Sequence, residues 1–315
     1  MTPTTDLATA SAPRAPWRPR GLTWAVLRLH RTALLLWLGA LVAAALLSVW
    51  MYAIGDEARR GIGGCAIPAT DRLPSCAEMD AIHADDIYAT GIGLLNGSLA
   101  FLVFPVTAWA GGALIGREME NGTARLAWVQ SVTPVRWLTV KLTVPAVLLT
   151  AGTTAALALL AWARGNDDPN LVGDWYLPDV FLAGGPTAVA YPLAGLAFGA
   201  LAGLLTGRAL SGAGLALGVW AVLHLTLGLC RDKLWPPVTA TRTLTGEATF
   251  ELPRSADQLE WHQHQYVGSD VRRVTVTYHP HSHFWPLQLV ETGLLLALTA
   301  AATGACYLLL RRRTR

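Results

Sequence analysis

Long apolar runs alternate with short polar segments along most of the 315-residue chain. Six runs are nearly free of charge and reach the ~20 residues that a helix needs to cross the hydrocarbon core of a bilayer. They cover residues 32–54, 88–116, 142–163, 181–207, 209–230 and 286–310. Strands of a membrane barrel are about 10 residues long and alternate in polarity, which these runs do not. The pattern predicts an all-α integral membrane protein with six transmembrane helices in residues 32–310.

Prolines stand inside two of these runs. Pro105 lies in the second run, and Pro186 and Pro192 lie in the fourth, each with glycine nearby. Proline removes a backbone donor and its ring clashes with the preceding turn, so kinks are expected in the second and fourth transmembrane helices.

Charge decides the orientation of the helices. Hydrophobic residues make up 53% of the chain and charged residues only 14%, and the Arg and Lys of membrane proteins concentrate in cytoplasmic loops. Both terminal segments and the loops after the second and fourth runs together hold fourteen basic and three acidic residues. The remaining loops hold ten basic and seventeen acidic residues, and cover residues 55–87, 164–180 and 231–285. We therefore expect both termini in the cytoplasm and these three loops outside it.

The two terminal segments carry much of this positive charge. Residues 1–31 read as a cytoplasmic tail, in which WRPRGLTWAVLRLHR mixes Arg with Trp and Leu. That stretch fits either an interfacial helix lying on the inner leaflet or ordinary anchoring by positive charge. Residues 311–315 form a basic tail at the other end.

Two cysteines fall in the first outer loop. Cys65 and Cys76 are separated by ten residues that include Gly and Pro. On the oxidising side of a membrane, such a spacing can close a disulfide that holds the loop together. A disulfide and a pair of free thiols both remain open interpretations.

The most polar inner loop has the sequence GREMENGTARLAWVQSVTPVRW, residues 116–137. Gly122 is expected to end the second transmembrane helix in a left-handed conformation, and Thr123 to cap a new short helix over residues 124–130. Thr133 followed by Pro134 is a second helix-start signal. We predict a short helix between two sharp breaks, with Arg117, Glu118 and Glu120 projecting into the cytosol. The plainer alternative is a charged hairpin that only fixes topology.

This loop resembles the one between the second and third helices of exporter-type (type-2) ATP-binding-cassette (ABC) permeases, of the kind common in actinomycetes. YHPHSHFWPLQLVETG, residues 278–293, resembles the start of the last helix in the same family. The resemblance covers most of the chain and is weak in the outer loops. Val129 stands where a hydroxyl residue is expected, and His283 where Arg is expected.

The resemblance implies a subunit of the bacterial cytoplasmic membrane whose inner loop is a coupling helix. In that family the coupling helix docks in a groove of a separate ABC ATPase subunit, and a second permease chain, identical or a sister, completes the transporter. The positions that the resemblance assigns to ATPase coupling are Arg117, Glu118, Glu120, Asn121, Gly122, Thr123 and Arg125.

No phosphate-binding loop of the form G-x-x-x-x-G-K-[ST] occurs in the chain, so we do not expect it to hydrolyse ATP. ATP and Mg²⁺ are expected on the partner subunit, with no cofactor bound by this chain, no enzymatic activity and no nucleic-acid partner. Two other function classes stay open: a secondary transporter or channel without an ATPase, and a membrane-embedded enzyme that uses Glu291 and the histidines.

Polar side chains are rare within the apolar runs. Asn96, His224 and Glu291 each lie five to eight residues from the outer end of a run. At ~1.5 Å rise per residue, all three sit roughly 10 Å below the outer surface. Ionisable groups at such depth usually face the helix bundle and mark functional pathways. They form either one intramembrane polar site or three separately paired groups.

A histidine-rich stretch precedes the last transmembrane helix. Residues 274–278, VTVTY, alternate like a short strand, and an extended backbone would place His279, His281 and His283 on one face. His262 and His264 lie nearby in the sequence. Such a cluster can bind Zn²⁺ or Cu²⁺, but no cysteine or ligand spacing supports it, and we expect no metal site.

Overall fold

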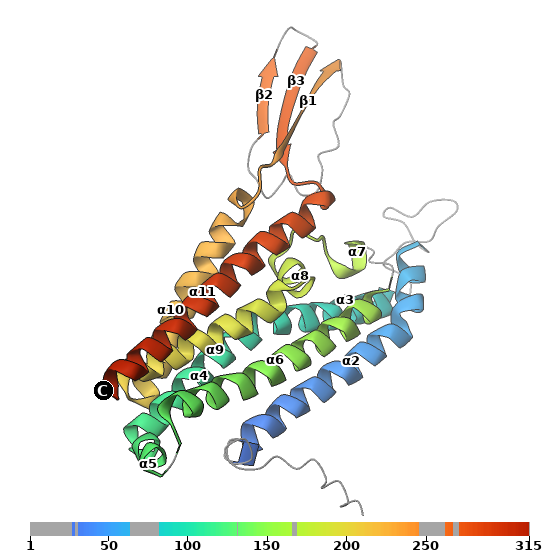
Figure 1. Ribbon diagram of the computed structural model, residues 1–315. Coiled ribbons are helices and arrows are strands. Elements are labelled where there is room, and N and C mark those ends of the chain that lie inside the picture. Colours follow the sequence, from blue (N-terminus) through green and yellow to red (C-terminus); the bar gives the residue numbers. More distant parts are fainter. Residues whose placement is uncertain are drawn as a thin grey trace, which may run out of the picture.

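A computed structural model describes residues 27–28, 31–63, 82–130, 132–165, 169–245, 262–266 and 271–314. Within these ranges, six helices are long and apolar enough to cross a membrane. They lie side by side in one bundle (Figure 1). The prediction of an all-α integral membrane protein with six membrane-spanning helices is therefore confirmed.

The elements follow one another from α2 to α11. The long helices are α2 (Arg31–Gly63), α3 (Ile82–Gly97), α4 (Val103–Glu120), α6 (Pro134–Arg164), α9 (Thr187–Thr206), α10 (Ala209–Cys230) and α11 (Phe284–Arg313). A π-helical turn, η2 (Ser98–Leu102), joins α3 to α4, so that these three elements form one span. Shorter helices are α5 (Thr123–Val129), α7 (Pro169–Val172) and α8 (Pro178–Ala183), with 3₁₀ turns η3 (Arg231–Lys233) and η5 (His281–His283).

The prolines act differently in the two spans. Pro105 lies just after the π-helical turn, and it cannot donate to the carbonyl of Phe101 four residues earlier, so the helix widens there. The single kinked helix predicted over 181–207 is interrupted instead: α8 ends at Ala183, and α9 starts after Pro186. Gly184 and Gly185 precede this proline, and the three together prevent a continuous helix. Pro192, by contrast, lies inside α9, which continues through it.

Small residues let α4, α9 and α10 pack backbone against backbone. A Cβ on Gly112 of α4 would lie 2.8 Å from the Ala213 nitrogen of α10. A Cβ on Gly203 of α9 would lie 2.7 Å from the Gly112 carbonyl oxygen. Without a hydrophobic force between helices in lipid, close van der Waals packing of this kind is what holds spans together. Among the six spans α9 is the most buried, and α4 and α10 both pack against it.

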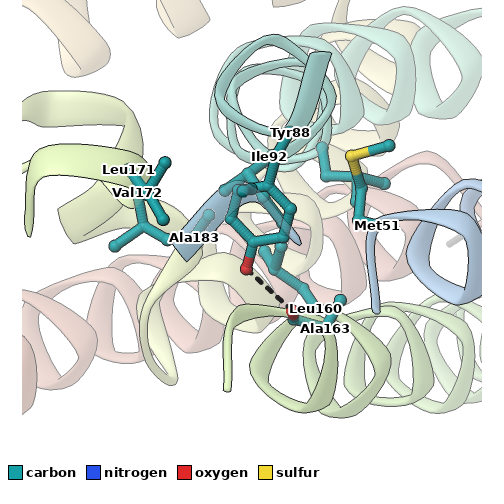
Figure 2. Close-up of a cluster of buried hydrophobic side chains, with 10 residues drawn as sticks. Met51, Tyr88, Ile92, Leu160, Ala163, Leu171, Val172 and Ala183 are labelled. Carbon is teal, nitrogen blue, oxygen red and sulfur yellow. Dashed lines mark hydrogen bonds between the residues drawn. The ribbon is translucent and has the colours of Figure 1, made fainter. Parts of the chain in front are cut away.

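A second buried cluster joins α2, α3 and α6 to the short helices α7 and α8 (Figure 2). Tyr88 of α3 lies in the middle of it and is fully buried. Its hydroxyl donates to the Ala163 carbonyl at 2.9 Å and contacts the Arg164 carbonyl at 3.2 Å. These carbonyls end α6 and have no partner in the next helical turn. Tyr88 therefore fixes the end of α6 against α3.

Three antiparallel strands stand beyond the end of the bundle, in the order β1-β3-β2. They are β1 (Val238–Thr245), β2 (His262–Tyr266) and β3 (Val271–Tyr278). The strand predicted over residues 274–278 is confirmed as the second half of β3. The end of the bundle below this sheet is called the sheet end. The opposite end, called the α5 end, holds α5, the start of α2 and the end of α11 (Figure 1).

Candidate functional site

The α5 segment, residues 117–141, connects α4 to α6 at the α5 end and contains every predicted coupling position. Helix α4 ends at Glu120, and the Asn121 amide donates back to the Arg117 carbonyl at 3.0 Å. Gly122 follows with φ +69° and ψ 0°. The predicted left-handed glycine is confirmed, and it turns the chain sharply into α5.

Thr123 plays a different part from the one predicted. The residue before α5 is Gly122, and Thr123 is the first residue of the helix itself. Its hydroxyl donates to the Glu118 carbonyl at 3.3 Å, so it satisfies an acceptor at the end of α4. The prediction that Thr123 caps α5 is wrong, because the glycine turn already places Thr123 within the helix.

The second helix start is confirmed. Thr133 has extended backbone, and its hydroxyl accepts from the Arg136 amide at 3.3 Å, while Pro134 opens α6. The α5 segment therefore has the predicted order of helix, break, short helix, break and helix. Both breaks arise from local residues, glycine at the first and Thr-Pro at the second.

Glu118 points into the protein rather than into solvent. One carboxylate oxygen forms an ion pair with Lys141 Nζ, and the other accepts from Trp137 Nε1 at 2.9 Å. Trp137 and Lys141 are four residues apart on α6 and thus on one face, and they are 1% and 2% exposed. We call these three residues the Glu118 cluster. It ties the end of α4 to the start of α6 across the base of α5.

Glu120 also bonds within the chain. Its Oε2 accepts from the Ala209 amide at 3.0 Å, at the start of α10. A carboxylate at a helix N-terminus satisfies a free donor and complements the helix dipole. Of the group predicted to project into the cytosol, Glu118 does not, because its carboxylate is held by Lys141 and Trp137 of α6. Arg117 and Glu120 are exposed, as predicted, and so are Asn121 and Arg125.

Helix α5 has one buried and one open face. Ala124 is fully buried, and Trp128 packs edge-on against Trp137 with ring centroids 5.7 Å apart. On the other side, Leu126 is 58% exposed and Val129 is 86% exposed, next to the exposed Arg125. This seven-residue helix lies outside the six spans. Its open face thus offers two apolar side chains and one cation to a partner.

Glu291 of α11 is fully buried near the sheet end. Its carboxylate accepts two bonds from Arg231, at 2.9 Å from Nε and 3.2 Å from Nη2, and a third from the Tyr191 hydroxyl at 2.6 Å. The Arg231 guanidinium also lies 4.5 Å above the Phe181 ring. Glu291, Arg231 and Tyr191 form the Glu291 cluster, which joins α11, η3 and α9.

Of the three predicted intramembrane polar residues, the structure groups two around Tyr191. The His224 ring lies 5.9 Å from the Tyr191 ring and stacks on Trp220 at 5.8 Å. Asn96 is 1% exposed, and its side-chain oxygen accepts from Arg164 at the end of α6. Asn96 therefore belongs to the contact between α3 and α6, whereas His224 and Glu291 both neighbour Tyr191.

Sequence reasoning missed four partners: Trp137 and Lys141 of Glu118, and Tyr191 and Arg231 of Glu291. One signal was present for Arg231. A carboxylate inside an apolar run requires a cation, and Arg231 directly follows the end of the fifth run. Tyr191 had no comparable signal, because a tyrosine in an apolar run is ordinary.

The histidines before α11 do not share one face. The chain leaves β3 at Tyr278 and turns through η5, so the extended backbone assumed for His281 and His283 is absent. His279 and His283 approach with their Nδ1 atoms 3.0 Å apart, while His281 stacks on Phe284. In the described ranges, no three His, Cys, Asp or Glu residues are grouped to hold a metal ion. Cys65 and Cys76, with their predicted disulfide, lie outside the described residues.

Comparison with known proteins gives one finding. A family model described as "ABC-2 membrane transporter related" matches residues 36–231. The match runs from α2 to the first residue of η3, and so includes the α5 segment and His224. No curated protein and no solved structure gives a significant match.

Proposed function

Since this chain belongs to the ABC-2 membrane transporter related family, we propose that it is the permease subunit of an ABC exporter, energised by a separate ATPase subunit docking on residues 116–141. The observation that carries the proposal is the open face of α5. Leu126 and Val129 are exposed there on a rigidly held helix outside the spans. Apolar side chains beside a cation are a common composition for a protein contact.

The Glu118 cluster supports a mechanical role for this helix. A force on α5 reaches α4 through Gly122 and α6 through Thr133–Pro134, and the Glu118–Lys141 ion pair keeps those two helices together. Movement of a docked partner would therefore shift two spans as a unit, as in rigid-body switching. A flexible loop would absorb the same force.

The remaining parts of the proposal follow from the sequence. The α5 end faces the cytoplasm of a bacterial plasma membrane, because the basic residues concentrate there. ATP and Mg²⁺ bind to the ATPase chains, as this chain has no phosphate-binding loop. Two permease chains, identical or sister chains, pair with two ATPase chains to enclose one transport path.

Photo-crosslinking tests the docking surface. A photoreactive residue in place of Val129, in membranes that co-express a candidate ABC ATPase chain, is expected to yield an adduct of both chains. Val222 of α10 is the matched control, since it is 67% exposed but lies within a span. Adducts at both positions, or at neither, would contradict docking on α5.

Topology is tested independently by reporter fusions. Fusions after residue 130 are expected to report from the cytoplasm, and fusions after residues 75 or 260 from outside. An external reporter at residue 130 would place α5 out of reach of any ATPase.

A further inference from the structure

The interruption between α8 and α9 leaves backbone groups inside the protein without helical partners. Phe181 and Thr187, which flank it, are both buried. The Phe181 carbonyl, at the end of α8, accepts a capping bond from the Gly184 amide at 3.1 Å, and the Thr187 amide is at the start of α9. Away from water, this amide and the second lone pair of the carbonyl must find partners outside the two helices. We call residues 184–186 the α8–α9 break.

One side chain from α11 bridges the break. Gln288 is fully buried, and its Nε2 donates to the Phe181 carbonyl. Its Oε1 accepts from the Thr187 hydroxyl at 2.8 Å and from the Thr187 amide at 3.3 Å. Gly185 leaves the space for this amide, because a Cβ there would lie 2.6 Å from Gln288 Oε1. The Thr187 hydroxyl also lies 3.3 Å from the Leu182 carbonyl of α8, so Gln288 and Thr187 together hold the two sides of the break.

The next turn of α11 carries a second buried side chain that bonds neighbouring elements. Glu291, three residues after Gln288 and on the same face, bonds Tyr191 of α9 and Arg231 of η3. Gln288 and Glu291 together tie the sheet end of α11 to both sides of the break and to the end of α10.

The other end of α11 contacts the α5 segment. Cys306 and Leu310 are fully buried in one cluster with Ala124 of α5 and Trp137 of α6. The Tyr307 hydroxyl lies 2.8 Å from the Thr139 hydroxyl of α6. Between these contacts and Gln288, α11 is one unbroken helix that runs from the α5 end to the sheet end (Figure 1).

We propose that α11 carries movement of the α5 segment to the α8–α9 break, and that Gln288 is the positioning residue that makes α8 follow. This inference rests on the proposed function, since the movement is supplied by the docked ATPase. A helix resists compression along its axis, so a displacement at Cys306 and Leu310 reaches Gln288. Because its amide holds both sides of the break, α8 changes its position at the sheet end with each ATP cycle.

Cysteine labelling of α8 tests the inference. Pro178, the first residue of α8, is exposed, and Pro178→Cys is introduced after Cys65, Cys76 and Cys230 are replaced by alanine. Cys306 is kept, because it is fully buried and forms part of the contact with the α5 segment. Labelling by a membrane-impermeant maleimide is compared without ATP and with ATP plus vanadate, in the full complex. In the parent the labelling rate is expected to change at least about fivefold, the lower end of ordinary allosteric coupling.

The variants separate transmission from simple structural support. Gln288→Leu removes all three bonds and is expected to abolish the ATP-dependent change, while ATP hydrolysis stays within about twofold of the parent. Thr187→Val removes the hydroxyl that contacts both Gln288 and the Leu182 carbonyl, and it should reduce the change. Thr187→Ser keeps the hydroxyl and should preserve the change. Thr299→Val is the control on α11, since that hydroxyl bonds only within its own helix, to the Leu295 carbonyl.

The outcomes are distinguishable. If the parent forms no complex with the ATPase, the proposed function itself fails. If the complex forms and hydrolyses ATP but the labelling rate does not change, α8 does not move and the inference is overturned. If the parent responds and Gln288→Leu responds equally, α11 does not act through Gln288 and the inference is overturned. Should Gln288→Leu fail to accumulate, the pair Thr187→Val and Thr187→Ser decides, and equal responses in both overturn it.

Discussion

Each end of the bundle holds a cluster of one glutamate, one cation and one aromatic side chain, and the two clusters serve different purposes. At the α5 end, Glu118 pairs with a lysine and accepts from a tryptophan. At the sheet end, Glu291 pairs with an arginine and accepts from a tyrosine. The Glu118 side chain is 17% exposed, whereas that of Glu291 is fully buried.

The partners explain the difference between the ends. Both partners of Glu118 lie on α6, so this cluster joins the two ends of the α5 segment to each other and leaves α5 projecting. The partners of Glu291 come from α9 and η3, so that cluster joins separate elements and leaves no side chain open. A carboxylate thus supports the proposed docking surface at one end and joins separate helices of the bundle at the other. Substitutions are expected to act on docking at the first and on stability at the second.

The largest effect is expected for Glu291→Ala. It leaves Arg231 nearly buried without a counter-charge, and removing one partner of a buried pair costs about 3–5 kcal/mol. Thermal unfolding in detergent should shift to a clearly lower temperature. The double variant Glu291→Leu, Arg231→Leu removes both charges and should recover much of the loss. An unchanged unfolding temperature for Glu291→Ala would remove the contrast between the ends.

The sequence predicted those features of both ends that depend on neighbouring residues. A span requires only some twenty consecutive apolar residues, and the turn at Gly122 and the helix start at Thr133–Pro134 are set by adjacent positions. Each of these predictions is confirmed. At residues 184–186 the sequence predicts only a kink, because a proline alone does not show whether another helix supplies partners for a complete break.

Pairings across the bundle could not be predicted in the same way. Glu118 bonds a lysine 23 residues later, Glu291 an arginine 60 residues earlier, and Asn96 an arginine 68 residues later. Each depends on which helices become neighbours, as do the backbone contacts of Gly112, Gly203 and Ala213 among α4, α9 and α10. Glycines are common in transmembrane helices, so their positions alone did not reveal which faces meet.

Glu118→Ala is expected to have the next largest effect. It leaves the buried Lys141 ammonium and Trp137 indole without their acceptor, at a cost of about 1.5–3 kcal/mol. The protein should still insert, but α4 and α6 lose their link, and ATP hydrolysis should continue with transport reduced. The control is Glu57→Ala on an exposed position of α2, which should change neither. Full transport by Glu118→Ala would mean that the Glu118 cluster only fixes topology.

A smaller effect is expected for Gly122→Val. A Cβ at this position meets nothing within 4 Å, so the cost comes only from the left-handed backbone, about 1–2 kcal/mol for an L-residue and more with β-branching. Coupling should fall as α5 changes its angle to α4. Gly122→Asn is the matched variant, because asparagine tolerates this conformation, and it should transport nearly like the parent. Equal losses of coupling in both variants would mean that coupling requires the absence of a side chain at residue 122, and not its left-handed backbone.

The smallest change in stability is expected for Val129→Ser, which restores the hydroxyl that related permeases are expected to have there. Val129 is 86% exposed, so the free energy of unfolding should move by less than about 0.5 kcal/mol. The affinity for the ATPase is measured separately, because the Val129 side chain lies on the open face of α5. If affinity for the ATPase falls while the unfolding temperature is unchanged, the α5 end is a docking surface whose contacts are absent from the free chain. A fall in unfolding temperature as large as that of Glu291→Ala would mean that the two ends are built alike.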